Sequence, residues 1–174
     1  MTFPAEIKGS EVRRVGIVID ADSGFSVTWS RVSNLFKKLS GCLPPSCPKE
    51  GLILNIGNQR IGARIMPNDA VPGMFEHFCH GLVPNQGKPL WNFTLRCVET
   101  AKLGHHAPFL DHYKTKAHIH TWLAWQSTSG ERMDEAITRN VLEHASNDAE
   151  AFVRWFIELF EIDPGPLVPP FLLG

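Results

Sequence analysis

Two aspartates separated by a single residue, Asp20 and Asp22, are the best placed side chains in this sequence for chemistry. They directly follow residues 15–19, a short apolar and largely β-branched run that predicts a buried strand. A turn and a helical pattern over about residues 27–39 come next. Ligands bind at the carboxyl ends of strands in open α/β sheets. Neighbouring carboxylates repel unless a cation lies between them, so the pair predicts a Mg²⁺ or Mn²⁺ site. The alternative is a solvated turn in which Asp22 or Ser23 caps the helix.

A second acidic loop follows the next part of the chain. Residues 52–55 and 60–66 predict two short strands, and Gly57-Asn58 between them is typical of a hairpin turn. The second strand ends just before Asp69, and a helix is expected over residues 74–82. The chain thus repeats the order strand, acidic loop, helix, and Asp69 and Glu76 join the candidate site residues.

The remainder of the sequence is mainly helical in pattern. Helices are expected over residues 90–103, 110–126, 132–142 and 149–160. The prolines that follow forbid a helix, and the apolar residues among them predict packing on the body or on a neighbour. We therefore expect an α/β fold with a helical C-terminal half, made of one domain over residues 1–162 and a Pro-rich tail over residues 163–174.

Composition limits the class of protein. Of 174 residues, 43% are hydrophobic and 20% are charged, which is typical of a globular chain rather than a disordered one. The net charge of -1 gives no global basic field, so any contact with nucleic acid has to be local. No apolar run approaches the roughly 20 residues that a membrane span needs. The N-terminus lacks the order of a signal peptide. These features predict a cytoplasmic protein without a membrane partner.

The candidate residues also occur in a recognisable order. Asp20 and Asp22 are followed by Glu76 and then by the cations Lys114 and Lys116. This order resembles that of the Toprim-like domain of topoisomerases, primases and OLD-type nucleases, and in particular a compact branch of the OLD type. Four stretches carry the resemblance: residues 15–22, 62–76, 116–126 and 152–160.

The resemblance implies a three-layer Toprim-like domain with a short, mostly parallel sheet. It implies that Asp20 and Asp22 are metal ligands, with Glu76 as the later acid in both metal binding and catalysis. Asp69 is a further candidate ligand. Lys116, more than Lys114, looks like the cation that steadies the scissile phosphate. The implied activity is that of a nuclease that uses Mg²⁺ or Mn²⁺ to cleave phosphodiesters in nucleic acid.

One feature departs from the Toprim pattern. A Toprim domain begins with a strand that ends in a glutamate, followed by a helix, ahead of the strand with the two aspartates. The residues before Asp20 are too few for that unit, and Glu6 and Glu11 follow no apolar run. We therefore expect a shortened family member, or a missing strand that a partner chain or an upstream segment supplies, and a homo-oligomer is a further expectation. The alternative function is a non-catalytic Toprim interaction module.

Other readings of the sequence stay open. His77 and His80 share a helix face, which suits a Mn²⁺ or Zn²⁺ site, although most histidines serve other roles. Trp122 and Trp125 could stack on bases, although aromatic residues at helical spacing usually pack inward. Paired acids after a strand are also found in response-regulator-like switches, which lack the lysine placement and the helical half seen here.

Overall fold

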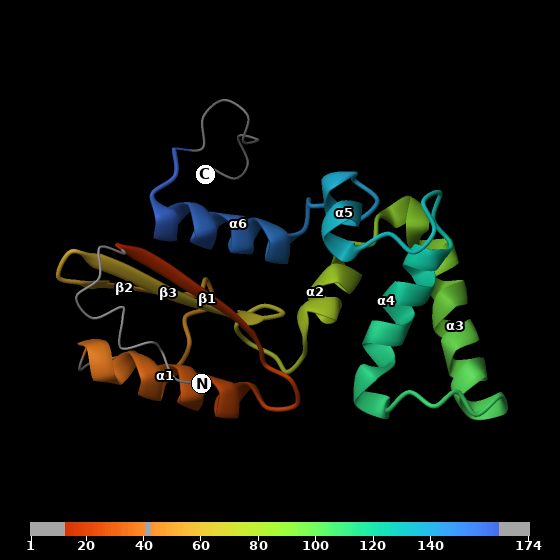
Figure 1. Cartoon of the computed structure of the whole chain (residues 1–174), viewed down its shortest axis with the longest axis horizontal. Coiled ribbons are helices and arrows are strands. Elements are labelled where there is room, and N and C mark those ends of the chain that lie inside the picture. The colour runs from red at the N-terminus through yellow and green to blue at the C-terminus, as the bar shows by residue number, and fades with distance from the viewer. Residues whose placement is uncertain (1–12, 41–42, 164–174) are drawn as a thin grey trace. The chain divides into compact units, whose positions relative to one another are not determined.

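The computed structural model of the chain describes residues 13–40 and 43–163. The helices and strands, in chain order, are β1 (Arg14–Asp20), α1 (Phe25–Ser40), β2 (Leu52–Ile56), β3 (Gln59–Met66), α2 (Phe75–Gly81), α3 (Lys88–Gly104), α4 (Lys114–Ala124), α5 (Met133–Thr138) and α6 (Asn147–Phe160) (Figure 1). Two short 3-10 turns, η2 (Asn85–Gly87) and η3 (Asp111–Tyr113), precede α3 and α4. The chain divides into two compact units: a sheet unit, which runs to Phe75 and resumes at Glu150, and a helical unit, Glu76–Ala149.

The sheet has three strands in the order β1-β3-β2. β1 runs parallel to β3, with Asp20 opposite Met66, and β2 runs antiparallel to β3. The predicted hairpin is confirmed, and Gly57 supplies the positive φ (+59°) that its tight turn requires. The predicted α/β class and the helical C-terminal half are therefore confirmed, with a sheet that is mixed.

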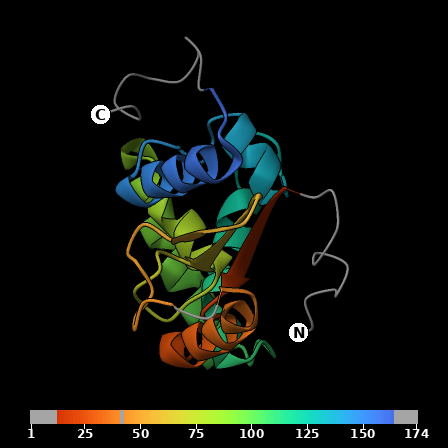
Figure 2. The same ribbon diagram turned by 90° about the vertical axis from the view of Figure 1, so that its left-hand side faces the viewer.

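The sheet unit has three layers, because side chains alternate between the two faces of each strand. The odd-numbered residues of β1 and β3 pack with α1 around one apolar core, which includes Ile61, Ala63, Ile65, Trp29, Val32 and Phe36. Even-numbered positions such as Gly16 and Gly62 face α6 instead. Figure 2 shows the sheet between α1 and α6.

Helix α6 packs unusually close to the sheet. A Cβ atom on Gly62 would lie 2.9 Å from the carbonyl oxygen of Leu52 and 3.0 Å from the Leu159 side chain. A Cβ atom on Gly16 would lie 2.9 Å from Leu159. The indole Nε1–H of Trp155 donates to the same Leu52 carbonyl, at 3.1 Å. The two glycines therefore provide the flat surface on which α6 rests.

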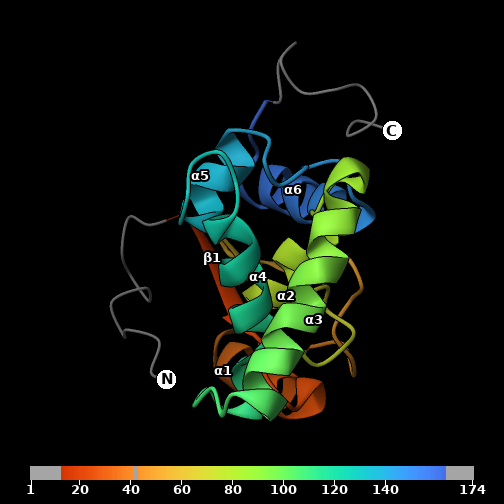
Figure 3. The same ribbon diagram turned by 90° about the vertical axis from the view of Figure 1, so that its right-hand side faces the viewer.

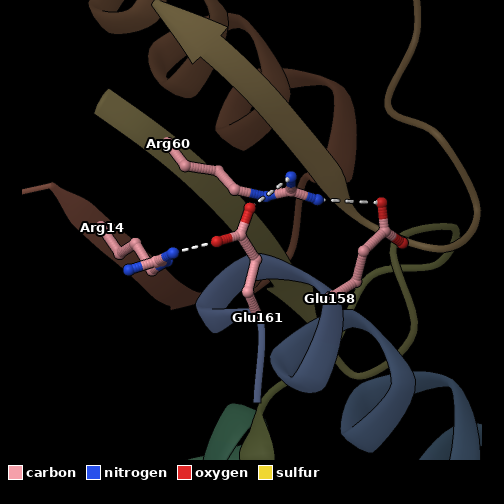
Figure 4. Close-up of polar contacts among 4 residues, drawn as sticks. All are labelled: Arg14, Arg60, Glu158 and Glu161. Carbon is pink, nitrogen blue, oxygen red and sulfur yellow. Dashed lines mark hydrogen bonds and ion pairs between the residues drawn. The ribbon is translucent and has the colours of Figure 1, made fainter. Parts of the chain in front are cut away.

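Ion pairs tie the end of α6 to the sheet (Figure 4). Arg60 of β3 reaches Glu158 at 3.3 Å and Glu161 at 3.4 Å, and Arg14 of β1 also pairs with Glu161. The carboxylates are more than half exposed. Exposed pairs of this kind contribute about 0–1 kcal/mol each, so these pairs orient α6 more than they stabilise it.

In the helical unit, α3 and α4 lie side by side (Figure 3). Two of its helices are shorter than predicted. The predicted helix over residues 110–126 includes the turn η3 and becomes helical only at Lys114. The predicted helix over residues 132–142 ends at Thr138, because Asn140 is left-handed (φ +58°) and the N–H groups of Val141 and Leu142 both turn back to the carbonyl of Ala136.

No helix in the described ranges is long and apolar enough to cross a membrane. The prediction of a single domain over residues 1–162 stays a prediction. The predicted Pro-rich tail falls, beyond Asp163, outside the described residues.

Candidate functional site

Asp20 and Asp22 lie at the carboxyl end of β1, where the parallel pair of strands ends. Asp20 is half-buried, and its Oδ1 accepts a hydrogen bond from the N–H of Phe75 at 2.8 Å. Asp22 is exposed and left-handed (φ +52°), a conformation that aspartate tolerates better than most residues. Its N–H donates to the carbonyl of Gly73 at 2.7 Å. The structure therefore places one predicted ligand at the last residue of β1 and the other just after it, and Gly73 and Phe75 hold this segment.

The third acid, Asp69, is buried and has partners within the protein. Its Oδ2 lies 2.8 Å from Nε of Arg64 in an ion pair without hydrogen-bond geometry, and both side chains are at most 1% exposed. Its Oδ1 accepts from the N–H of Ile65 at 2.6 Å and from the thiol of Cys47 at 3.6 Å. Asp69 thus closes the turn after β3, and it is the predicted metal ligand that is least accessible.

Burial dominates the electrostatics around Asp69. It raises the pKa of the Asp69 carboxyl to about 6, although the Ile65 N–H and the Arg64 guanidinium both act to lower it. Burial, reinforced by the Asp69 charge, likewise raises the pKa of the Cys47 thiol to about 12. The Cys47 thiol is therefore a buried donor to the carboxylate rather than a reactive thiolate.

In the helical unit, the structure brings two predicted catalytic residues together. Glu76 lies in the first turn of α2 with a side chain only 8% exposed, and its Oε1 is 3.3 Å from Nζ of Lys116 on α4. Lys116 itself is 51% exposed. The residues beside this pair also meet, since Nε2 of His77 on α2 lies 3.0 Å from the hydroxyl of Thr115 on α4. The competing candidate, Lys114, instead pairs with Glu99.

The structure also tests how closely potential metal ligands gather. Within residues 13–40 and 43–163, no group of three or more His, Cys, Asp or Glu side chains is placed to hold a metal ion. His80, one of the histidines considered for such a site, instead stacks on Trp91, with ring centroids 4.7 Å apart.

Of the two tryptophans, one is in the core and one is on the surface. Trp122 is 1% exposed and contacts Trp91, whereas Trp125 is 42% exposed. The ring centroids of Trp125 and the half-exposed Phe93 lie 5.7 Å apart. The guanidinium of Arg96 lies over the same Phe93 ring, 5.7 Å from its centroid. We call Phe93, Arg96 and Trp125 the aromatic patch. The inward packing predicted for both tryptophans holds only for Trp122.

Sequence reasoning missed the role of Arg64 and the contacts of His80 and His118 with Trp91. Arg64 is a cation within the apolar run of β3, which is a signal that a buried counter-charge is needed. His80 and His118 carry no such signal, because their contacts with Trp91 join three separate helices.

Most of the chain matches a protein-family model. A family described as a protein of unknown function, DUF3226, matches residues 1–161. The chain belongs to the DUF3226 family. No curated protein and no solved structure matches this DUF3226 chain. The family assignment therefore covers both compact units, while the function has to be argued from the residues.

The histidines of this DUF3226 chain predict a pH dependence of stability. Burial, together with Lys88 and His77, lowers the pKa of His80. Burial, together with Lys114 and His80, lowers the pKa of His118 despite the opposing charge of Glu99. The imidazoles of His80 and His118 are therefore protonated less readily in the folded state than in the unfolded state. The stabilisation is present above the ordinary histidine pKa of 6.5 and is lost as the pH falls below it.

We expect the free energy of unfolding, measured by urea denaturation, to fall between about pH 7.5 and about pH 5.5. The fall should be smaller in the double variant His80→Gln/His118→Gln. The exposed His120, changed to Gln, serves as the control and should leave the slope unchanged. An equally steep fall in the double variant would show that these two imidazoles are not its cause.

Proposed function

We propose that this chain is a Toprim-like divalent-metal-binding protein that cleaves phosphodiester bonds in nucleic acid. Asp20 and Asp22 are the proposed ligands of the metal. The resemblance assigns Glu76 and Lys116 to the same reaction. The observation that carries the proposal is the position of the two aspartates at the carboxyl end of a strand in a parallel pair.

The two aspartates suit Mg²⁺ or Mn²⁺ better than a metal that needs a closed protein cage. Asp22 is exposed and Asp20 is half-buried, so the loop offers carboxylate oxygens at a site open to solvent. Mg²⁺ is commonly held by one or two carboxylates and completes its shell with water and substrate phosphate. Such an ion would polarise the scissile phosphate and neutralise the charge that develops on its oxygens.

Lys116 is the proposed cation for the phosphate. Its ammonium is half-exposed even while it pairs with Glu76, so it remains accessible to an anion from solvent. Glu76 is almost fully buried, and its charge needs the lysine or another cation beside it. The pair therefore holds Lys116 in one orientation before a substrate arrives.

The aromatic patch supports single-stranded nucleic acid as the substrate class. Phe93 and Trp125 are each more than 40% exposed, and exposed aromatic rings stack on bases without regard to sequence. Arg96 lies over Phe93 and forms no ion pair with the described residues, so its charge remains available to a phosphate. Base stacking contributes about 1–3 kcal/mol per base in such sites.

Metal binding is tested by calorimetry with Mg²⁺ and Mn²⁺ on the full chain. We expect Asp20→Asn and Asp22→Asn to abolish binding, because each removes one charged ligand of a site that has few. The matched control is Asp134→Asn, an exposed acid on α5 that pairs with Arg132. Unchanged binding in both ligand variants would remove the basis of the proposal.

Cleavage is tested with single-stranded DNA and RNA in Mn²⁺. We expect Lys116→Ala to lower the rate by about 100-fold or more, as the loss of a transition-state cation does elsewhere. Lys114→Ala, the control on the same helix, should retain activity because that lysine pairs with Glu99. Trp125→Ala should weaken binding of the strand, measured in EDTA. Metal binding without any cleavage by the unmodified protein would instead identify a non-catalytic interaction module.

A further inference from the structure

Strand β1 is an edge strand whose outer side is open at Gly16 and Val18, whereas just beyond the strand Gly73 bridges Asp22 on that side. Among the described residues its only neighbour in the sheet is β3. The carbonyl of Arg13 and the N–H of Ala21 both bond to the β3 side, to Arg60 and Met66. The direction of backbone bonding alternates along a strand, so the odd-numbered residues of β1 bond to β3 and the even-numbered ones point away from it. Gly16 and Val18 therefore present N–H and C=O groups along an open edge.

A groove runs beside this edge. It has a volume of about 490 Å³ and lies between β1 and α1, with Ile17 and Ile19 on one wall and Val32 and Leu35 on the other. Arg31 and Lys38 also border it, and both extend flexible side chains to solvent. On the opposite face of the strand, Val18 is 47% exposed. An open backbone edge next to an apolar groove is the arrangement that accepts a further β-strand.

We propose that the strand added here is β1 of a second copy of this chain. The two strands run antiparallel about a two-fold axis at Ile17, so that Gly16 of one copy lies opposite Val18 of the other. Each such pair exchanges two hydrogen bonds, which satisfies the outward groups of Gly16 and Val18 in both copies. The two Ile17 residues face each other as a pair without hydrogen bonds.

The sequence of β1 is complementary to itself in this register. Arg14, at one end, faces Asp20 at the other end of the second copy, so opposite charges meet twice. Arg14 also pairs with Glu161, and its five N–H donors allow it to contact both acids. A shift by two residues in either direction breaks the charge match and shortens the overlap. Charge therefore favours this register over its neighbours.

Side-chain packing agrees with the same register. Val15, Ile17 and Ile19 lie on the α1 face of β1, so the second copy places the same three residues beside the groove and extends its apolar surface. On the other face, the exposed Val18 lies opposite Gly16, which has no side chain to obstruct it. The dimer thus joins two three-stranded sheets into one continuous sheet, with no edge left at β1.

The first test measures the mass of the full chain by light scattering over a range of concentrations. The unmodified protein and the control Val18→Thr, which keeps the shape and the N–H, should be dimers. Val18→Pro should be a monomer, because proline removes an outward N–H and blocks the edge without removing a bond to β3. A monomeric unmodified protein would overturn the proposal, and so would a Val18→Pro dimer. Asp20 is left unchanged because it belongs to the proposed metal site.

The second test does not depend on whether the proline variant folds. In the proposed register Ile17 faces its own copy, at the short Cα spacing of about 4.5 Å that disulfides tolerate. Mild oxidation of Ile17→Cys should give a covalent dimer. Val15→Cys faces Ile19 of the second copy and should give none above the background of the unmodified protein. Equal cross-linking of the two variants, or none in Ile17→Cys, would rule out this register.

Discussion

Replacing Asp69 by asparagine should destabilise the protein by about 3–5 kcal/mol, the typical cost of leaving one partner of a buried ion pair uncompensated. Asparagine retains an oxygen that can accept from the Ile65 N–H and tolerates the left-handed backbone at this position (φ +59°). The variant therefore removes the charge and little else. Arg64 is 1% exposed and cannot lose its proton, so its charge would remain buried without the carboxylate of Asp69 to balance it.

The shift in the midpoint of urea denaturation measures the stability lost in Asp69→Asn. Two further variants show whether the uncompensated charge causes this loss. Asp134→Asn removes one acid of an exposed ion pair with Arg132 and should cost at most about 1 kcal/mol. The double variant Arg64→Met/Asp69→Asn removes both charges and should recover much of the stability lost in Asp69→Asn. A loss in Asp69→Asn no larger than that in Asp134→Asn would contradict the structural role assigned to Asp69.

The second large effect is expected for Trp155→Ala. The indole is 2% exposed, rests against Gly51 and Gly16, and donates to the carbonyl of Leu52. Removal of so large a buried ring costs about 3–5 kcal/mol, because the surroundings relax only partly into the cavity. The free energy of unfolding in urea is the appropriate measurement, since α6 from Glu150 onward belongs to the sheet unit and its loss should expose the sheet.

Two substitutions separate the contributions of the indole. Trp155→Phe keeps a buried ring but leaves the Leu52 carbonyl without its donor, so we expect a smaller loss than for alanine. Phe156→Ala is the neighbouring control, because Phe156 is 42% exposed and lies on the outer side of α6. If Trp155→Ala costs no more than Phe156→Ala, α6 does not depend on the indole for its place on the sheet.

The sequence was informative where a pattern is local. The β-branched run before Asp20 and the Gly57-Asn58 turn predict β1 and the hairpin, because burial and turn geometry act over a few residues. The helix expected over residues 132–142 is too long, since the apolar pattern continues through Val141 and Leu142. The left-handed turn at Asn140 lets these residues stay partly or fully buried outside a helix.

Site residues that depend on distant parts of the chain are harder to predict. Arg64 is buried partly by α6, and its Nη1 lies 3.5 Å from the carbonyl of Ala151, 87 residues away in sequence. No local sequence pattern shows that α6 buries Arg64, so the sequence does not predict the pairing of Arg64 with Asp69. The pairing of Glu76 with Lys116 also joins separate helices. Glu76 and Lys116 were identified from the order of charged residues, which resembles that of the Toprim-like domain, and not from periodicity.

The sheet unit is discontinuous in the chain, and this has a consequence for how the protein is made. During synthesis, β1, α1 and the hairpin emerge from the ribosome before the residues of the helical unit, and α6 emerges after them. Until then the face of the sheet formed at Gly16 and Gly62 has no cover. The nascent chain must therefore hold an incomplete β-layer while the later helices are synthesised, and uncovered apolar surface of this kind makes partly folded chains prone to aggregate.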